Sequence, residues 1–575
     1  MKSSRPSSVF SLLAPYRLEI GLLLLLAFLS NGLNLWIPQI SAKAIDSFVK
    51  GNFDTQTIFW ELGIASAIIF FLVLLQGILQ TYTSEKVARD LRAQVAEKIG
   101  RQSYVFIQNV SPGKLLTNLT ADTDAIKMFV AMAIVAIASS VIIIIGAAAL
   151  LLFTNFALGL AVLTVVPLIG ATFFLIFKKV RVLFVRTREV LDWLNKVINE
   201  SILGAALIRI LGGQHLEEGK FLKANEEARQ VGMKVLGLFA MMIPTITFIS
   251  NLATIILITF GGWLVMNSSM TIGQLSAFNS YVMLFIFPII SLGFMSNFIA
   301  QANVSYGRIK EVLDAEDPKE EGTRAVPLKG EVAMDSVELL FEEKHTLKNI
   351  SFTAHPGSKT AIIGPTAAGK TQLLQILSGL ILPTHGRVTY DGFPIEEYTR
   401  ESLYSQIAFV FQDSIIFNMS LRENIAFNGA MGEQDIQKAI RAAELQDFIQ
   451  ALPEGLDTVV SERGSDLSGG QKQRIMLARA LAMNPRILLL DDFTSRVDAR
   501  TEEAILTNIT RLYPDLTLIS VTQKISAIEN YEQIIVLMEG EILGMGTHTH
   551  LMETCPEYVQ IYNSQRSTNH YELHT

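Results

Sequence analysis

Long apolar runs dominate the first three hundred residues of the chain, whereas the remainder alternates short apolar stretches with glycine and polar residues. A helix crosses a bilayer core of about 30 Å with about 20 apolar residues. Runs of that length lie near residues 18–41, 57–82, 129–153, 156–177, 236–266 and 272–300. The pattern therefore predicts six membrane-spanning helices, because the buried helices of a large soluble core would not need runs of this length.

Basic residues distinguish the two sides of the predicted membrane. Lys and Arg are concentrated in two long links, 83–128 and 178–235, whereas the short links 154–155 and 267–271 contain neither. Cytoplasmic loops carry the excess of Lys and Arg in membrane proteins. We therefore expect both termini and the two long links in the cytoplasm.

The two long links are too long for ordinary loops and keep a helical spacing of apolar residues, for example over 84–107 and 189–211. We expect the membrane helices to continue into the cytoplasm, so that each link reverses once. The expected turns lie near 118–125 and near 203–213.

From about residue 329 the pattern changes to short strands and helices separated by glycine. The apolar stretch 361–363 leads directly into a Gly-x4-Gly-Lys-Thr loop, and 372–380 continues as a helix. In this context the loop amides cradle phosphates, the lysine reaches the terminal phosphates and the threonine hydroxyl binds magnesium. The loop consists of Gly364, Pro365, Thr366, Ala367, Ala368, Gly369, Lys370 and Thr371.

Composition narrows the class of protein further. Half of the 575 residues are hydrophobic, and the mean hydropathy of +0.37 is too high for an ordinary soluble enzyme. The formal charge of −7 gives no reason to expect a nucleic-acid partner. The single cysteine, Cys555, excludes an internal disulfide and argues against a cysteine-based metal site.

A second motif follows the phosphate loop after nearly a hundred residues. It consists of Leu467, Ser468, Gly469, Gly470 and Gln471, and the apolar strand 487–490 that comes next ends in Asp491. In this order and spacing the three motifs resemble the ATPase domain of ATP-binding cassette (ABC) transporters. Six spans followed by such a domain resemble the exporter class of that family over nearly the whole chain.

The resemblance implies a multidomain fold. Residues 1–313 would form an all-α, six-helix transmembrane domain similar to type I ABC exporters, with intracellular loops ending in short coupling helices. Residues 314–328 would form a charged linker, and 329–575 an α/β P-loop nucleotide-binding domain. The expected location is the cell membrane, with the ATP-binding domain in the cytoplasm.

Further site residues follow from the resemblance. Asp491 would hold magnesium through water, Gln412 falls in the family's glutamine loop, and Phe341 falls at its adenine-stacking position. The expected ATP-binding residues are Phe341, 364–371, Gln372 and Gln412; the magnesium residues are Thr371, Gln412 and Asp491; the signature residues are 467–471. Ser495 and Asp498 would belong to a loop that crosses the dimer interface. Ala367, Ala368 and Gln372 depart from the family pattern, which leaves the preference for ATP over GTP open.

Two departures bear on hydrolysis. Asp492 occupies the position of the family's hydrolytic glutamate, and Gln523 occupies that of its switch histidine. Aspartate withdraws the carboxylate by roughly 1.3 Å, and a misplacement of about 1 Å can cost about a hundredfold in rate. Glutamine cannot become cationic as histidine can. The sequence therefore predicts a site that binds Mg²⁺ and ATP well and hydrolyses ATP slowly.

An intact signature beside a degenerate catalytic position predicts that two different chains share one function: this chain supplies a signature, and its partner supplies the catalytic glutamate and histidine. In this family the signature faces the γ-phosphate held by the opposite subunit, so a chain with one such domain must dimerise. We expect a second ABC half-transporter as the partner, in a heterodimer that exports hydrophobic small molecules or lipids through the bilayer. A homodimeric lipid or peptide exporter and an ABC protein that ATP binding gates remain as alternatives.

Overall fold

The computed structural model describes residues 9–317, 322–341, 344–427, 429 and 431–572, apart from the side chains of residues 11, 243, 341 and 567–572. The expected linker is therefore described only in part. The chain divides into two compact units. The first comprises Met1–Arg101 and Val110–Glu316, and the second comprises Gln102–Asn109 and Asp317–Thr575.

The first unit is entirely helical in the part of the chain that is described. Its helices are α1 (Val9–Leu12), α2 (Arg17–Val49), α3 (Thr55–Arg101), α5 (Pro112–Thr117), α6 (Thr123–Met128), α7 (Ile134–Thr154), α8 (Phe156–Leu163), α9 (Val165–Leu203), α10 (Ala205–Ile210), α11 (Gln214–Ile256), α12 (Gly262–Met266) and α13 (Ile272–Leu313). The short 3-10 helix η1 (Ala14–Tyr16) and the π-helical segments η2 (Asn118–Asp122), η3 (Phe129–Ala133) and η4 (Leu257–Gly261) connect neighbouring helices.

Six helical stretches of the described residues are long and apolar enough to cross a membrane. They are Ala14–Val49, Thr55–Arg101, Pro112–Thr154, Phe156–Leu203, Gln214–Met266 and Ile272–Leu313. Each contains one of the six predicted runs, so the prediction of six spans is confirmed. Many of their large apolar side chains are exposed, for example Phe70, Phe71 and Phe153, as expected for a surface that faces lipid.

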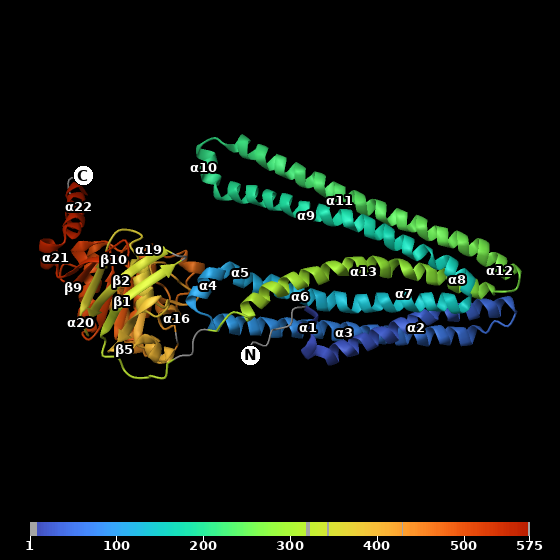
Figure 1. Cartoon of the computed structure of the whole chain (residues 1–575), viewed down its shortest axis with the longest axis horizontal. Coiled ribbons are helices and arrows are strands. Elements are labelled where there is room, and N and C mark those ends of the chain that lie inside the picture. The colour runs from blue at the N-terminus through green and yellow to red at the C-terminus, as the bar shows by residue number, and fades with distance from the viewer. Residues whose placement is uncertain (1–8, 318–321, 342–343, 428, 430, 573–575) are drawn as a thin grey trace. The chain divides into compact units, whose positions relative to one another are not determined.

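Within this unit α9 and α11 run side by side and form a long hairpin (Figure 1). The short helix α10 joins them at one end, and α8 and α12 lie at the other end. The helices α2, α3, α7 and α13 pack against one another as a bundle, and α13 also contacts α9 and α11 of the hairpin. The prediction of a turn near 203–213 is confirmed, because α9 ends at Leu203 and α11 begins at Gln214.

The prediction of a turn near 118–125 is wrong. The chain remains helical there, and the break lies earlier, between the end of α3 at Arg101 and the start of α5 at Pro112. Pro112 has no N–H and suits the first turn of a helix, while the residue before a proline is disfavoured in helical conformation. Ser111 lies outside the helical region, with φ +70° and ψ 136°. The short helix α4 (Tyr104–Val110) lies in this break.

The second unit is built on two sheets. A six-stranded sheet has the order β10-β9-β3-β8-β7-β6, and a four-stranded sheet has the order β2-β1-β4-β5. The strands are β1 (Val332–Phe341), β2 (Lys344–Ala354), β3 (Lys359–Ile363), β4 (His385–Tyr390), β5 (Phe393–Pro394), β6 (Ile407–Val410), β7 (Ile487–Asp491), β8 (Thr517–Val521), β9 (Gln533–Met538) and β10 (Glu541–Gly546).

Helices cover both faces of the six-stranded sheet. Alternate residues of a strand face opposite sides: Ile362 and Leu489 join the core that contains α14, whereas Ile363 and Leu488 join the core that contains α19 and α20. These helices are α14 (Lys370–Leu377), α15 (Arg400–Tyr404), α16 (Leu421–Ile425), α17 (Glu433–Ala442), α18 (Gln446–Gln450), α19 (Gly469–Ala482), α20 (Ala499–Leu512), α21 (His548–Thr554) and α22 (Pro556–Glu572).

The sheet determines where the site lies. β3, β8, β7 and β6 are parallel neighbours, so their carboxyl ends lie along one edge. Ligands of open α/β sheets bind at this edge. The loops that follow β3, β7 and β8 therefore meet there, and they contain the phosphate loop, Asp492 and Gln523.

Candidate nucleotide-binding site

The loop between β3 and α14 has the backbone that its glycines predict. Gly369 precedes α14 with φ +97°, a left-handed conformation that glycine adopts without strain. A Cβ atom on Gly364 would lie 2.0 Å from the backbone oxygen of Leu537. Glycine is therefore required at both positions: at Gly364 because the backbone packs closely there, and at Gly369 because the chain enters the helix with a left-handed conformation.

Lys370 extends back into this loop. Its Nζ donates hydrogen bonds to the backbone oxygens of Gly364 at 2.9 Å and Pro365 at 2.8 Å. Burial lowers the pKa of Lys370, while Asp492 and Asp491 act in the opposite direction. The cation is thus held where the Gly-x4-Gly-Lys-Thr pattern predicts that phosphates bind.

Thr371 and Asp491 offer oxygen ligands at the neighbouring position. The Thr371 hydroxyl donates to Asp491 Oδ1 at 3.2 Å. Asp491 is 2% exposed, and its burial raises its pKa despite that hydrogen bond. Mg²⁺ prefers oxygen ligands and is usually bound by one or two carboxylates together with substrate phosphates and water. The two side chains fit such a site, and the described residues contain no cluster of three or more His, Cys, Asp or Glu that would hold a metal alone.

The structure brings Asp492 and Gln523 to the same edge of the sheet. Asp492 is half-buried with φ +45°, and its N–H donates to the backbone oxygen of Val521 at 3.0 Å. Burial raises the pKa of Asp492, whereas Lys370 and Lys524 lower it. Gln523 follows two residues after Val521 and its side chain is exposed.

Two of the remaining expected ATP-binding residues, Gln372 and Gln412, lie at this edge, and the third, Phe341, belongs to the four-stranded sheet. Gln372 is in the first turn of α14 and is partly buried. Gln412 lies in the loop after β6 with an exposed side chain. Phe341 ends β1, and its side chain lies outside the described part of the structure.

The signature residues begin a second feature, the amino end of α19. Ser468 is the N-cap: its Oγ accepts from the N–H of Gln471 at 3.3 Å, and the Gln471 side chain accepts from the N–H of Ser468 at 2.8 Å. Leu467 precedes this cap and is partly buried against the core. The free backbone N–H groups of a helix N-terminus attract anions.

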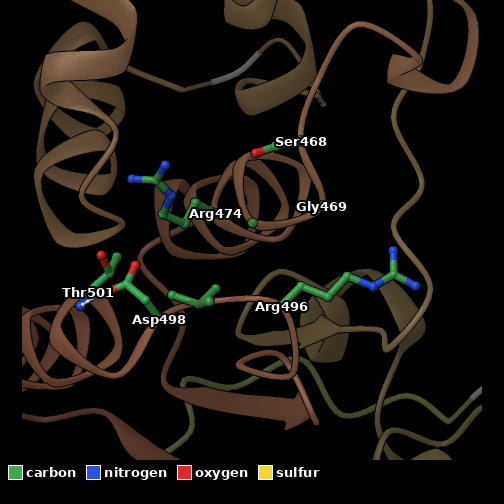
Figure 2. Close-up of a pocket in the computed structure, with 8 residues that line it drawn as sticks. Ser468, Gly469, Arg474, Arg496, Asp498 and Thr501 are labelled. Atoms are coloured by element: carbon green, nitrogen blue, oxygen red, sulfur yellow. Dashed lines mark hydrogen bonds between the residues drawn. The ribbon is translucent and has the colours of Figure 1, made fainter. Parts of the chain in front are cut away.

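The loop after Asp492 packs against this helix end and forms a pocket of about 420 Å³ (Figure 2). A Cβ atom on Gly469 would lie 2.8 Å from Arg496 Cδ, and one on Gly470 would lie 2.8 Å from the Arg496 backbone oxygen. The two signature glycines therefore allow the loop to approach closely. The pocket is lined by Ser468, Gly469, Gly470, Arg474, Arg496, Val497, Asp498 and Thr501.

Ser495 and Asp498 are held at opposite ends of that loop. The side chain of Gln473, 1% exposed, donates to Ser495 Oγ at 3.1 Å and accepts from the N–H of Arg496 at 3.2 Å. Asp498 caps α20 by accepting from the N–H of Thr501 at 3.0 Å, and this hydrogen bond lowers the pKa of Asp498.

The phosphate loop and the signature do not form one pocket in the described part of the chain. The lining of the signature pocket includes no residue of 364–371. The unit therefore presents two separate half-sites, one for phosphates and magnesium and one with a helix N-terminus.

Sequence reasoning missed the residues that hold these loops from outside the motifs. Gln473 lies two positions after the signature, and its place on the buried face of α19 could have indicated it. The hydroxyl of Tyr104 in α4 accepts from Gln375 Nε2 of α14 at 3.4 Å. Tyr104 lies in the break between α3 and α5, whereas the turn of this link was predicted near residues 118–125. Lys524, in the loop after β8, donates to Glu502 of α20, and Gln565 of α22 accepts from the N–H of Ile525 in the same loop. No local sequence signal indicates either contact.

Comparison with known proteins places both units in one family. Residues 20–289 match the family model for the ABC transporter transmembrane region, and residues 347–495 match the ABC transporter model. The chain is 31% identical to the uncharacterized ABC transporter ATP-binding protein YknU of Bacillus subtilis, over 96% of each chain.

Two further similarities concern relatives with more specific names. The chain is 29% identical to an ATP-dependent lipid A-core flippase of Syntrophus aciditrophicus, over 85% of this chain and 82% of the relative. It also resembles the solved structure of a bacterial Atm1-family ABC exporter with ATP bound, with a TM-score of 0.77 and 26% identity, over 96% of this chain and 98% of that one.

Proposed function

Because the chain belongs to the ABC transporter family, we propose that it exports hydrophobic or amphipathic compounds as one half of a heterodimer. It is an ABC exporter half-transporter, a multi-pass membrane protein with a cytoplasmic ATP-binding domain. We assign the transmembrane domain to residues 1–313, the linker to 314–328 and the nucleotide-binding domain to 329–575.

The proposal assigns a role to each half-site. Residues 364–371 would bind the phosphates of ATP, with Gln372 and Gln412 beside them and Phe341 against the base. Thr371, Asp491 and Gln412 would hold Mg²⁺, which neutralises phosphate charge when bound. The signature residues 467–471 would face the ATP held by the partner, and Ser495 and Asp498 would cross the interface.

The separation of the two half-sites, together with Asp492 and Gln523, supports this proposal best. The lining of the signature pocket contains no residue of the phosphate loop, so in this proposal a second subunit would bring its phosphate loop to the signature of this chain. This chain would give an intact signature to the site at which the partner hydrolyses ATP. Its own phosphate loop would hold ATP beside a carboxylate that is one methylene short.

Two relatives support the substrate class. One is named a lipid A-core flippase, and another is named a probable multidrug resistance transporter of Bacillus subtilis, 29% identical over 96% of this chain. One name refers to a lipid and the other to drugs. We therefore propose drugs or lipids as the compounds that this chain helps to export.

The test is restoration of the catalytic pair in the assembled complex. Asp492→Glu with Gln523→His should raise the ATPase rate, since the second site would then hydrolyse as well. An unchanged rate with normal ATP binding would contradict the degenerate site. A high ATPase rate of the unmodified chain on its own would favour a homodimeric exporter. ATP-driven accumulation of a dye in inverted vesicles would exclude a protein in which ATP binding only gates a channel.

A further inference from the structure

The loop after β8 is held by the last helix of the chain. We call residues 522–525 the switch loop. Gln565 of α22 donates from Nε2 to the backbone oxygen of Gln523 at 2.5 Å, and its Oε1 accepts from the N–H of Ile525 at 3.0 Å. One side-chain amide therefore binds the backbone on both sides of Lys524.

The position of Gln565 is set by core packing of α22. Tyr558, two turns earlier on the helix, is 0% exposed and belongs to the core that contains α19 and α20. Its hydroxyl makes a 2.8 Å hydrogen bond with His548 Nδ1 of α21. Residues seven positions apart share a helix face, so the buried anchor at Tyr558 directs Gln565 to the switch loop.

The opposite side of the switch loop is held by α20. Lys524 Nζ donates to Glu502 Oε2 at 2.9 Å and to the backbone oxygen of Thr494 at 3.3 Å. Glu502 is 5% exposed, and Ile525 is 1% exposed. The loop is thus fixed on both sides, whereas the side chain at position 523 is exposed.

We propose that Gln565 is a positioning residue for ATP hydrolysis, through which the C-terminal helix α22 keeps the switch loop in register with Asp492. Gln565 binds only the backbone of the loop, so it acts whichever side chain occupies position 523. A loop that is already ordered loses less conformational entropy when the side chain at 523 must meet the γ-phosphate. The role of position 523 rests on the proposed function, whereas the attachment of the switch loop to Gln565, here called the tether, does not.

Hydrogen exchange of the full-length chain tests the tether directly. Gln565→Ala should accelerate amide exchange in peptides covering 523–526, roughly five-fold, because Ile525 loses its acceptor. Gln560→Ala is the matched control, since Gln560 is an exposed glutamine on the same helix. Equal exchange in Gln565→Ala and Gln560→Ala would overturn the inference. Should Gln565→Ala fail to fold, Gln565→Asn, which is shorter by one methylene, takes its place with the same expectation.

Turnover tests the consequence for catalysis. In the assembled complex carrying Asp492→Glu and Gln523→His, adding Gln565→Ala should reduce the gain in kcat that those two substitutions bring roughly five-fold, while the partner's site continues to hydrolyse ATP. The KM for ATP should stay unchanged, because Gln565 does not touch the phosphate loop. Gln565→Glu keeps an acceptor for Ile525 but cannot donate to residue 523 in its ionised form, so its kcat should fall between the two. An unchanged kcat, or a KM that rises in step with the loss, would overturn the positioning role.

The two proposals fail in different ways. If Asp492→Glu with Gln523→His brings no gain in turnover, the proposed function fails, and the exchange comparison still decides whether Gln565 fixes the loop. If the double substitution raises turnover but Gln565→Ala behaves as Gln560→Ala does, the inference about α22 fails alone.

Discussion

At the scale of single residues, Gly293 allows close packing between two helices of the membrane domain. Phe173 and Phe177 of α9 stack at 5.3 Å between ring centroids, and Phe294 of α13 lies 5.9 Å from Phe177. A Cβ atom on Gly293 would lie 1.8 Å from the Phe173 ring. Gly293 therefore lets α13 approach these rings.

Gly293→Ala should destabilise the protein by about 1–3 kcal/mol, the usual cost of overpacking, although alanine is the better helix former. The loss of stability is measured as a lower melting temperature of the purified full-length chain. Gly307→Ala is the control, because Gly307 is on the same helix and a Cβ there meets nothing within 4 Å. Equal melting temperatures for the two variants would show that the rings move aside freely.

At the scale of elements, the ion pair of Lys524 and Glu502 links the switch loop to α20. The Glu502 side chain is 6% exposed and that of Lys524 is 41% exposed. Lys524→Met should lower the free energy of unfolding by about 2 kcal/mol, because the buried Glu502 carboxylate remains unpaired. This loss is smaller than that for a fully buried partner, since Lys524 is partly exposed. Unfolding by urea measures this loss.

Lys348→Met is the matched control for that ion pair. Lys348 pairs with Glu541 at 3.0 Å, and both side chains are half exposed at 41% and 55%. Exposed pairs contribute about 0–1 kcal/mol, so this variant should stay close to the unmodified protein. A Lys524→Met loss no larger than the Lys348→Met loss would mean that Glu502 finds another partner.

The sequence could predict elements whose signals are local. The strand 361–363, the glycine loop and α14 follow one another directly, so their geometry follows from neighbours in the chain. The six spans follow from run length alone. The break before α5 also had a local signal, Ser111 before Pro112, which outweighed the helical spacing around it.

Contacts between distant elements could not be predicted in this way. Gln565 meets the switch loop only because Tyr558 is buried, and this requires the packing of α22 to be known. The same holds for Lys524 and Glu502, which are 22 positions apart. A single exposed-looking Gln or Lys in a sequence carries no information on such partners.

At the scale of the whole molecule, a heterodimer predicts unequal effects from substitutions in one chain. Gly469→Asp places a carboxylate at the amino end of α19, where the partner's ATP would present its γ-phosphate, and its side chain collides with Arg496. This variant should lower the ATPase rate of the assembled complex at least a hundredfold, on the order of losing a transition-state contact.

Asp492→Asn should change the same rate less than about twofold, because the carboxylate it removes is already too short to place water well. The ratio of the two effects in one purified complex is the measurement, with ATP binding to each variant as the check on folding. A symmetric hydrolase would lose most of its activity from both substitutions, since Asp492→Asn would then remove the carboxylate on which every turnover depends. Comparable losses from both substitutions would therefore place ATP hydrolysis on this chain as well as on its partner.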